Sequence, residues 1–271
     1  MIEDSGAGKV LVAYLHNAHD VQHSFHHCLT SLVNYDAAHR QRLFASAGPL
    51  MMRCGTDGLV EARNKVMAHF LDQTVEEWLW SVDTDMGFPA DVVDRLIDSA
   101  DPVKRPVVGA LCFGLRLGQP DGLGGYLTEP FPTIYGWSQD KSGMMGFRAA
   151  IDYAQHSLIQ VAGTGAACLL VHRSVAEKIR AEDGDTWFDP VRYPDGRFLS
   201  EDLSFCYRVA KAGFPVFVNT AVKTTHAKQI WVGEQQFMEH RLLARFLDDA
   251  VLKTGGQDAE DSDSANSDRS G

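Results

Sequence analysis

The feature that most constrains the fold is a pair of aspartates, Asp83 and Asp85, placed directly after a short apolar stretch. Residues 77–82 read Glu-Trp-Leu-Trp-Ser-Val, a pattern typical of a buried β-strand. Pro89 and an amphipathic segment at 90–99 follow, as expected for a helix with proline in its first turn. This order predicts an open α/β sheet with both carboxylates at the edge where such sheets bind ligands.

Two carboxylates this close together are unfavourable at a sheet edge unless a cation neutralises them. Their hard oxygens favour Mg²⁺ or Mn²⁺, ions that keep coordination positions open for substrate phosphates. The pair therefore predicts a divalent-cation site acting on a nucleotide diphosphate compound. The competing interpretation is a solvated helix N-terminus, where aspartate is favoured in any case. Asp83 comes too early for a simple cap, and Trp80 and Val82 bury the approach to it.

Apolar periodicity predicts strands and helices that alternate through the first half of the chain. The expected strands lie at 9–15, 42–47, 77–82 and 106–113, and the expected helices at 21–34, 58–71 and 90–99. A Gly- and Pro-rich segment, 114–132, predicts a long functional loop or lid. Beyond it we expect strands at 133–137, 146–151, 157–162, 166–172 and 215–219, reaching 223–226, and helices at 174–181, 201–212 and 233–252. The predicted fold class is α/β: a Rossmann-like mixed sheet, mostly parallel, flanked by helices, with antiparallel additions in the second half.

Composition limits the classes of function. The chain is 45% hydrophobic and 23% charged, as in ordinary globular proteins, and its formal net charge of −11 argues against general nucleic-acid binding. Five scattered cysteines without a CxxC pair indicate core thiols in a reducing compartment. We find no signal peptide and no apolar run approaching the ~20 residues of a membrane span. These observations predict a soluble, cytoplasmic protein (the host cytoplasm if the protein is viral) without a membrane segment.

Four ordered segments carry a resemblance to a known family. They are Ala62-Arg63-Asn64 on an early helix, Asp83-Thr84-Asp85, Gly163-Thr164-Gly165 before an apolar strand, and Ser200-Glu201-Asp202 opening a helix, with His226 after a short strand. This set resembles the glycosyltransferases of the GT-A fold, in particular the family-two enzymes and related bacteriophage glycosyltransferases. The resemblance implies one GT-A-like domain over residues 1–253, with a nucleotide-binding half at about 9–113 and an acceptor-binding half at about 114–253. Residues 254–271 form an acidic, Ser-rich tail that we expect to be disordered.

The resemblance also implies an activity: metal-dependent transfer of a sugar from a nucleotide sugar, UDP-linked by preference, to a hydroxyl acceptor. Negative charge develops on the diphosphate as the glycosidic bond breaks, and Mn²⁺ or Mg²⁺ stabilises it. By resemblance Asp85 binds the metal, Asp83 contacts the ribose or supports the ion, and His226 is a late ligand or phosphate contact. A purely structural histidine is the alternative for His226.

Further donor-site residues follow from the same resemblance. Arg63 and Asn64 are implied beside the nucleotide, with Arg63 on base or phosphate, although Arg63 can equally be a surface arginine. Gly163 and Gly165 permit close approach of the backbone to a ligand, or form only a tight turn.

On the acceptor side, Asp202 is implied as the general base and Glu201 as the residue that holds the acceptor, which favours inversion. Plain N-capping by Ser200 is the alternative. Trp187 and Phe188 are candidates to stack on a sugar, or are core residues.

Other interpretations stay open on the sequence alone. A nucleotidyltransferase on a similar sheet is the nearest enzymatic alternative, but its Gly-rich phosphate loop should follow the first strand, where this chain has His16-Asn17-Ala18-His19. A non-catalytic sugar- or protein-binding domain is the alternative from another class. His19, His23 and His26 share a helical face and pose a second metal hypothesis, although the face they occupy is opposite the apolar one. The acceptor class, whether protein, glycan, lipid or modified base, has no readable signal.

Overall fold

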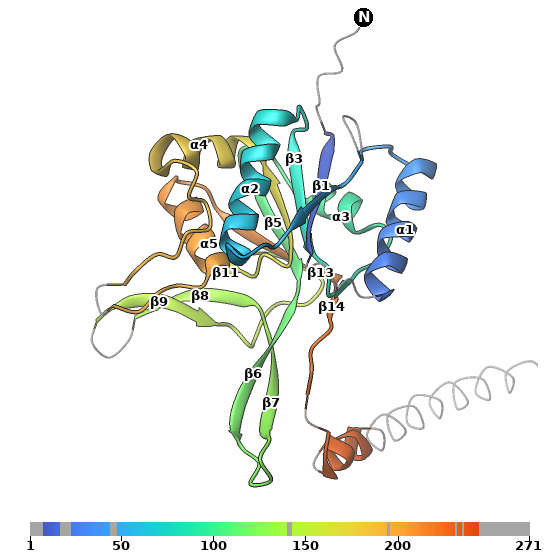
Figure 1. Cartoon of the computed structure of the whole chain (residues 1–271), viewed down its shortest axis with the longest axis vertical. Helices are drawn as coiled ribbons and strands as arrows, with labels where there is room; N and C mark the ends of the chain where they lie inside the picture. The colour runs from blue at the N-terminus through green and yellow to red at the C-terminus, as the bar shows by residue number, and fades with distance from the viewer. Residues whose placement is uncertain are drawn as a thin grey trace, which may run out of the picture. The chain divides into compact units, whose positions relative to one another are not determined.

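Figure 1 shows the computed structural model of the chain, which describes residues 8–16, 23–43, 48–139, 143–193, 196–230, 232–234 and 236–243. The chain divides into two compact units, one formed by residues 1–116 and 129–228 and the other by 117–128 and 229–271. The expected acidic tail at 254–271 lies outside the described residues. The predicted domain boundaries stay a prediction.

A seven-stranded sheet forms the centre of the first unit, in the order β10-β13-β5-β12-β3-β1-β2. Its strands are β1 (Val10–His16), β2 (Leu50–Arg53), β3 (Trp78–Asp83), β5 (Val107–Leu111), β10 (Leu158–Val161), β12 (Cys168–His172) and β13 (Val216–Lys223). β1 is parallel to β2 and β3, and β13 is parallel to β5. β12 is antiparallel to both β3 and β5, and β10 is antiparallel to β13, so only β12 and β10 run against the other five. The predicted fold class, a mostly parallel mixed α/β sheet, is confirmed.

Helices cover both faces of this sheet (Figure 1). One layer contains α1 (His23–Ala38) and α3 (Val92–Ser99), and the other contains α2 (Gly58–Gln73), α4 (Arg173–Asp183) and α5 (Glu201–Lys211). The alternating residues of β1 divide between the two layers, so Val12 packs in the first core and Leu11 in the second. Both faces are apolar, which explains why the buried strands read as continuous hydrophobic runs.

Three small sheets accompany the central one. β8 (Ile134–Gln139) lies between β9 (Met145–Ala149) and β11 (Gly163–Thr164), and β4 (Met86–Gly87) pairs with β14 (Thr225–His226). The third sheet corrects an expectation: most of the predicted loop at 114–132 is a hairpin of β6 (Phe113–Pro120) and β7 (Tyr126–Pro132). A two-stranded ribbon leaves alternate backbone N–H positions unpaired, so its prolines do not prevent strand pairing. At its tip, Asp121 Oδ1 accepts from Leu123 N (2.8 Å) and Gly125 N (2.9 Å).

Two other expectations need adjustment. The sequence predicts the second strand at 42–47, but residues 44–47 lie outside the described part of the chain. The second strand of the structure, β2, begins after Pro49. Its period of two places Leu50 and Met52 against the core while Met51 and Arg53 are exposed, which suits an edge strand that starts after proline. Of the helix expected at 233–252, residues 236–243 are helical and 244–252 are not described. In the described part of the chain, no helix has the length and apolarity that a membrane crossing requires.

Candidate functional site

The aspartate pair lies at the carboxyl edge of the central sheet, where a cavity of about 200 Å³ opens. Asp83 is the last residue of β3, and Asp85 comes directly before β4. The cavity is lined by the ends of β1 and β3 and by residues around β2 and the start of α2: Leu15, His16, Cys54, Leu59, Asp83, Thr84 and Asp85. The parallel direction of β1, β2 and β3 brings their carboxyl ends together here.

Asp85 and His226 are brought together by the small sheet of β4 and β14, where His226 stands opposite Met86. Ala227 N donates to the Asp85 carbonyl oxygen at 2.8 Å, which fixes the two segments side by side. Asp85 Oδ2 lies 3.0 Å from His226 Nε2, and Lys228 Nζ donates to the same oxygen at 3.0 Å. One carboxylate oxygen is therefore shared by two cationic or hydrogen-bonding groups.

The other ring nitrogen of His226 determines what Nε2 can do. Nδ1 lies 2.8 Å from the Phe113 carbonyl oxygen, which can only accept, so Nδ1 carries a hydrogen. Nε2 then points at Asp85 either with a proton of its own or with its lone pair facing a cation held between the two side chains. A carbonyl that orients the distal nitrogen in this way is the usual arrangement behind a metal-binding histidine.

The Asp85 carboxyl is held in its ionised form. Burial by itself raises the pKa of this group, but the hydrogen bonds from His226 and Lys228, together with their charges, outweigh burial and lower the pKa to about 2. The group is only about two-thirds covered, since its side chain is 34% exposed. At neutral pH this oxygen is a permanent anion, available to a cation.

Asp83 has a different partner, the buried guanidinium of Arg63 on α2. Arg63 Nη2 donates to Asp83 Oδ1 at 3.0 Å and to Oδ2 at 3.2 Å, and Nη1 donates to the Ala166 carbonyl at 3.4 Å. The guanidinium carbon also lies 5.6 Å from the centre of the Phe188 ring. Arg63 is therefore a buried residue and not a surface arginine. It holds Asp83 in position.

Arg63 also lies near a second pair of carboxylates, Glu201 and Asp202. Arg63 Nε lies 4.0 Å from Glu201 Oε1 and has no hydrogen-bond partner among the described residues. Glu201 is the first residue of α5, and burial, followed by the negative charge of Asp202, raises the pKa of its carboxyl. One guanidinium thus lies between the end of β3 and the start of α5.

Asp202 is oriented by its own helix terminus. Its Oδ1 accepts hydrogen bonds from the Ser200 hydroxyl and from Leu203 N, the latter at 2.8 Å. Both bonds that it receives from described residues end on Oδ1, which leaves Oδ2 available to an incoming hydroxyl. Ser200 therefore bonds the Asp202 side chain and makes no side-chain cap bond to the helix backbone. The bond from Leu203 N satisfies one backbone N–H of the first helical turn, so Asp202 also contributes to the helix N-terminus.

Trp187 and Phe188, the candidate acceptor contacts, lie in the core. Trp187 is fully buried and donates its indole N–H to the Ala176 carbonyl at 2.9 Å, while Phe188 stacks on Phe205 with ring centroids 4.7 Å apart. Neither ring presents a face on which a sugar could stack. The structure thus favours the core interpretation of both residues.

Asn64, Gly163 and Gly165 are surrounded by hydrogen-bonded or closely packed protein groups. The Asn64 amide bridges to the loop before α5, donating to Asp189 Oδ1 at 2.7 Å and accepting from Phe188 N at 2.9 Å. A Cβ at Gly163 would lie 2.9 Å from atoms of both Leu203 and Phe147, and one at Gly165 would lie 3.1 Å from the Thr133 hydroxyl. These contacts show close packing at both glycines.

The described ranges contain no group of three or more His, Cys, Asp or Glu side chains arranged to hold a metal ion. Asp85 and His226 nevertheless form an oxygen–nitrogen pair of the kind that Mn²⁺ accepts, and Mg²⁺ or Mn²⁺ completes its coordination with water and phosphate oxygens. The residues present fit such an ion with two protein ligands. On α1, His23, His26 and His27 are exposed, and His19 lies outside the described residues.

Sequence reasoning missed two residues near the site. Lys228 contacts Asp85, and the signal available was its position two residues after His226 in an extended segment. Tyr135 lies on β8 near the start of α5, and burial, then Asp202 and Cys206, raises the pKa of its phenol to about 12. Nothing in its local sequence marks Tyr135, because its neighbours come from distant segments.

Comparisons with known proteins give similarities of fold only. No protein family and no curated protein matches the sequence. Solved structures similar to the chain include A197 from STIV, 15% identical with a TM-score of 0.46, covering 82% of this chain and 86% of that one. Another is GalNAc-T7 with UDP, GalNAc and Mn²⁺, 9% identical with a TM-score of 0.48, covering 82% of this chain and 43% of that one. The chain thus spans less than half the length of GalNAc-T7.

Proposed function

We propose that this protein is a glycosyltransferase that uses Mn²⁺ or Mg²⁺ to move a sugar from a nucleotide sugar, preferably UDP-linked, to a hydroxyl acceptor. The observation that carries the proposal is the position of Arg63, which bonds Asp83 and lies 4.0 Å from Glu201. Transfer of a sugar needs a site for the leaving diphosphate and a general base for the acceptor hydroxyl. These two sites must lie no farther apart than the length of the bound substrate. One guanidinium spans the two carboxylate pairs, so the arrangement meets that requirement.

The donor side of the site is the cavity of about 200 Å³ beside Asp83. With Arg63 balancing its charge, Asp83 is a fixed carboxylate that can accept hydrogen bonds from ribose hydroxyls. Thr84 and the residues at the ends of β1 and β2 form the walls against which the nucleobase of the donor would lie. A nucleoside is therefore the part of the donor that this cavity suits.

The metal would be held by Asp85 and His226. When bound there, a divalent ion supplies a Lewis acid that stabilises negative charge on the departing diphosphate. Lys228 donates to the same Asp85 oxygen, so an ion bound there would compete with this hydrogen bond. Its ammonium would then be available to pair with a phosphate.

Asp202 is proposed to act as the general base. Its Oδ2 would accept the proton of the acceptor hydroxyl as that oxygen attacks the anomeric carbon, while Ser200 and Leu203 hold Oδ1. Glu201 lies one residue away and would orient the acceptor. A single displacement assisted by one base inverts the configuration at the anomeric carbon, so inversion is part of the proposal.

A thermal-shift experiment tests the donor half of the proposal. The purified chain is melted with UDP, GDP and their sugar conjugates, each with Mn²⁺, with Mg²⁺ or with EDTA. Ligand that binds only the native state raises its melting temperature, by an amount equivalent to ~2.7 kcal/mol at 100 times Kd. We expect a metal-dependent increase with one nucleotide and loss of that increase in Asp85→Ala.

The matched control is Glu177→Ala, which removes an exposed carboxylate from α4. This variant should retain the full nucleotide-induced shift. The proposal is overturned if no nucleotide stabilises the folded protein in any metal condition, and a non-catalytic binding domain then becomes the leading interpretation. A shift of equal size in Asp85→Ala would exclude Asp85 as the metal ligand.

A further inference from the structure

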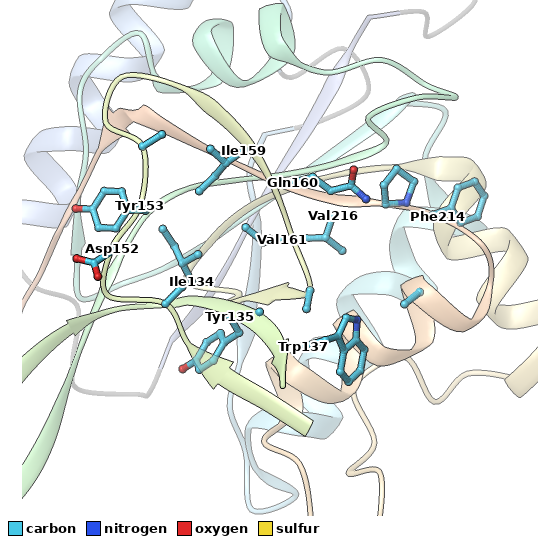
Figure 2. A pocket seen from close by; sticks show the side chains of 16 residues that line it. Ile134, Tyr135, Trp137, Asp152, Tyr153, Ile159, Gln160, Val161, Phe214 and Val216 are labelled. Carbon is cyan, nitrogen blue, oxygen red and sulfur yellow. The ribbon is translucent and has the colours of Figure 1, made fainter. Parts of the chain in front are cut away.

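A cavity of about 710 Å³ lies away from the aspartate pair, at the sheet edge formed by β10 (Figure 2). Its walls come from β8, β10, the segment between β9 and β10, and the turn from α5 into β13. This volume falls within the ~300–1,000 Å³ typical of ligand sites. None of the roles assigned above uses the cavity directly.

The most unusual residue of this cavity is Trp137, whose side chain is 44% exposed although the ring is held firmly. It stands opposite Phe147 on β9 and stacks on it, with centroids 4.4 Å apart and an interplanar angle of 29°. Phe147 in turn packs against Gly163, where a side chain would collide with it. The indole is thus a fixed, partly exposed aromatic platform.

The remaining lining combines apolar rings with neutral hydrogen-bonding groups. Tyr153 and Asp152 lie at one end of the view, and Phe214 and Trp137 lie toward the other (Figure 2). Gln160 contributes an exposed amide between them. Among the described residues that line the cavity, Asp152 is the only charged one, and Lys, Arg and His are absent.

This chemistry selects one class of ligand. A sugar ring presents an apolar C–H face that stacks on an aromatic ring and an edge of hydroxyls that donate to carboxylate and amide oxygens. An anionic ligand would meet the Asp152 carboxylate with no compensating cation, in a chain of net charge −11. A purely apolar ligand would make no hydrogen bond with Asp152 or Gln160, both of which are exposed. A neutral saccharide satisfies both kinds of group.

A series of packed residues links the start of α5 to the lining of this cavity. Tyr135 lines it and pairs with Gly163 in the sheet of β8 and β11. Gly163 is packed against Leu203, which follows Asp202 directly. The charge of Asp202 also contributes to the raised pKa of the Tyr135 phenol, after burial. In the proposal, one end of a bound chain of sugars is directed toward Asp202.

We infer that this cavity binds successive sugar units of a neutral oligosaccharide, with Trp137 as the stacking platform and Asp152 and Gln160 as hydroxyl acceptors. Its identification as the acceptor's binding site rests on the proposed function. The acceptor class is then a neutral glycan whose reactive hydroxyl reaches Asp202.

Tryptophan fluorescence and calorimetry can test this inference on the full chain. The probes are maltohexaose, cellohexaose and chitohexaose, with a hexamer of galacturonic acid as the anionic counterpart. We expect at least one neutral hexamer to bind and to reduce acrylamide quenching of Trp137, the exposed tryptophan among the described residues. Trp137→Ala should weaken that binding at least ~10-fold, and Asp152→Asn by roughly 3-fold, in line with a lost aromatic anchor and a lost hydrogen bond.

The matched control is Tyr207→Ala, which removes an aromatic ring of similar exposure, 40%, from α5 outside the cavity. It should bind the hexamers as the wild type does. If Trp137→Ala fails to fold, the quenching measurement on the wild type and the Asp152→Asn titration decide the question. The inference is overturned if no neutral hexamer binds at about 10 mM, if Trp137→Ala binds equally well, or if the anionic hexamer is preferred.

The two proposals can fail separately. Trp137→Ala should retain the nucleotide-induced thermal shift, because Trp137 does not line the cavity beside Asp83. Hexamer binding without any nucleotide-induced shift would remove the transferase proposal and leave the cavity as a saccharide site. A nucleotide shift without hexamer binding would leave the transferase and remove the glycan acceptor.

Discussion

The two carboxylate pairs of this protein are close in space but differ in how their charge is balanced. Asp83 has Arg63, and Asp85 has both His226 and Lys228, so each aspartate of the first pair has a cationic or hydrogen-bonding partner within 3.0 Å. Among the described residues, Glu201 has an ion-pair contact with Arg63 Nε at 4.0 Å, and Asp202 accepts hydrogen bonds from the neutral donors Ser200 and Leu203. The surroundings of Asp85 lower the pKa of its carboxyl, whereas those of Glu201 raise the pKa of its carboxyl.

This difference suits the two roles proposed above, metal binding for the first pair and contact with the acceptor for the second. The pKa of the Asp85 carboxyl is lowered to about 2, which suits a group that holds a cation at any physiological pH. The pKa of the Glu201 carboxyl is raised by burial and by Asp202, so this carboxyl holds a proton more readily than an ordinary glutamate does. This contrast supports the roles proposed above, with Asp85 as the metal ligand and Glu201 beside the acceptor.

The largest expected effect is a loss of turnover, and it concerns Asp202 of the second pair. Asp202→Asn removes the proposed base without changing the shape of the side chain, and we expect kcat to fall by ~10²–10⁴-fold. The affinity for the nucleotide should stay unchanged, because Asp202 does not line the donor cavity. A transfer assay with parallel nucleotide titration measures both quantities, with Asp98→Asn on α3 as control. Equal loss of nucleotide affinity and turnover would place Asp202 in the donor site instead.

A second comparison lies within the first pair and concerns stability. Asp83→Asn leaves the buried guanidinium of Arg63 without its counter-charge, and we expect destabilisation by about 2–3 kcal/mol, since Asp83 itself is partly exposed. Asp85→Asn should cost less than about 1 kcal/mol, because Lys228 is 38% exposed and can turn to water. Urea unfolding in EDTA measures both variants. Similar losses in the two would contradict the structural role assigned to Arg63.

The smallest expected effect concerns Glu201 and pH. A raised pKa means that the stability linked to its protonated form is complete below the ordinary value of 4.5 and is lost as pH rises through the raised pKa. Glu201→Gln should therefore be more stable than the wild type at pH 7, by roughly 2 °C in Tm, and equal to it near pH 4. Calorimetry at the two pH values measures the difference. If Glu201→Gln is less stable than the wild type at pH 7, the folded protein stabilises the charge of the Glu201 carboxylate, contrary to this prediction.

Part of the fold was predictable because local periodicity reports burial. Continuous apolar runs identified β1, β3 and β5, and amphipathic segments identified α2 and α5. The hairpin at 113–132 was not predictable by the same means, because its glycines and prolines signal a loop while pairing between its two strands compensates for them. Trp187 and Phe188 were ambiguous for a related reason: an aromatic pair in a loop gives no periodic signal to show which way it faces.

The sequence by itself determined the α/β class and the positions of the acidic residues at the ends of predicted strands and helices, since both follow from neighbours along the chain. Only the tertiary structure decided which charges meet. His226 and Lys228 reach Asp85 from 141 and 143 residues away, and Arg63 joins Asp83 to Glu201. These contacts depend on the insertion of β12 between β3 and β5 and on the pairing of β4 with β14. Strand order is set by packing of the whole core, which no local pattern encodes.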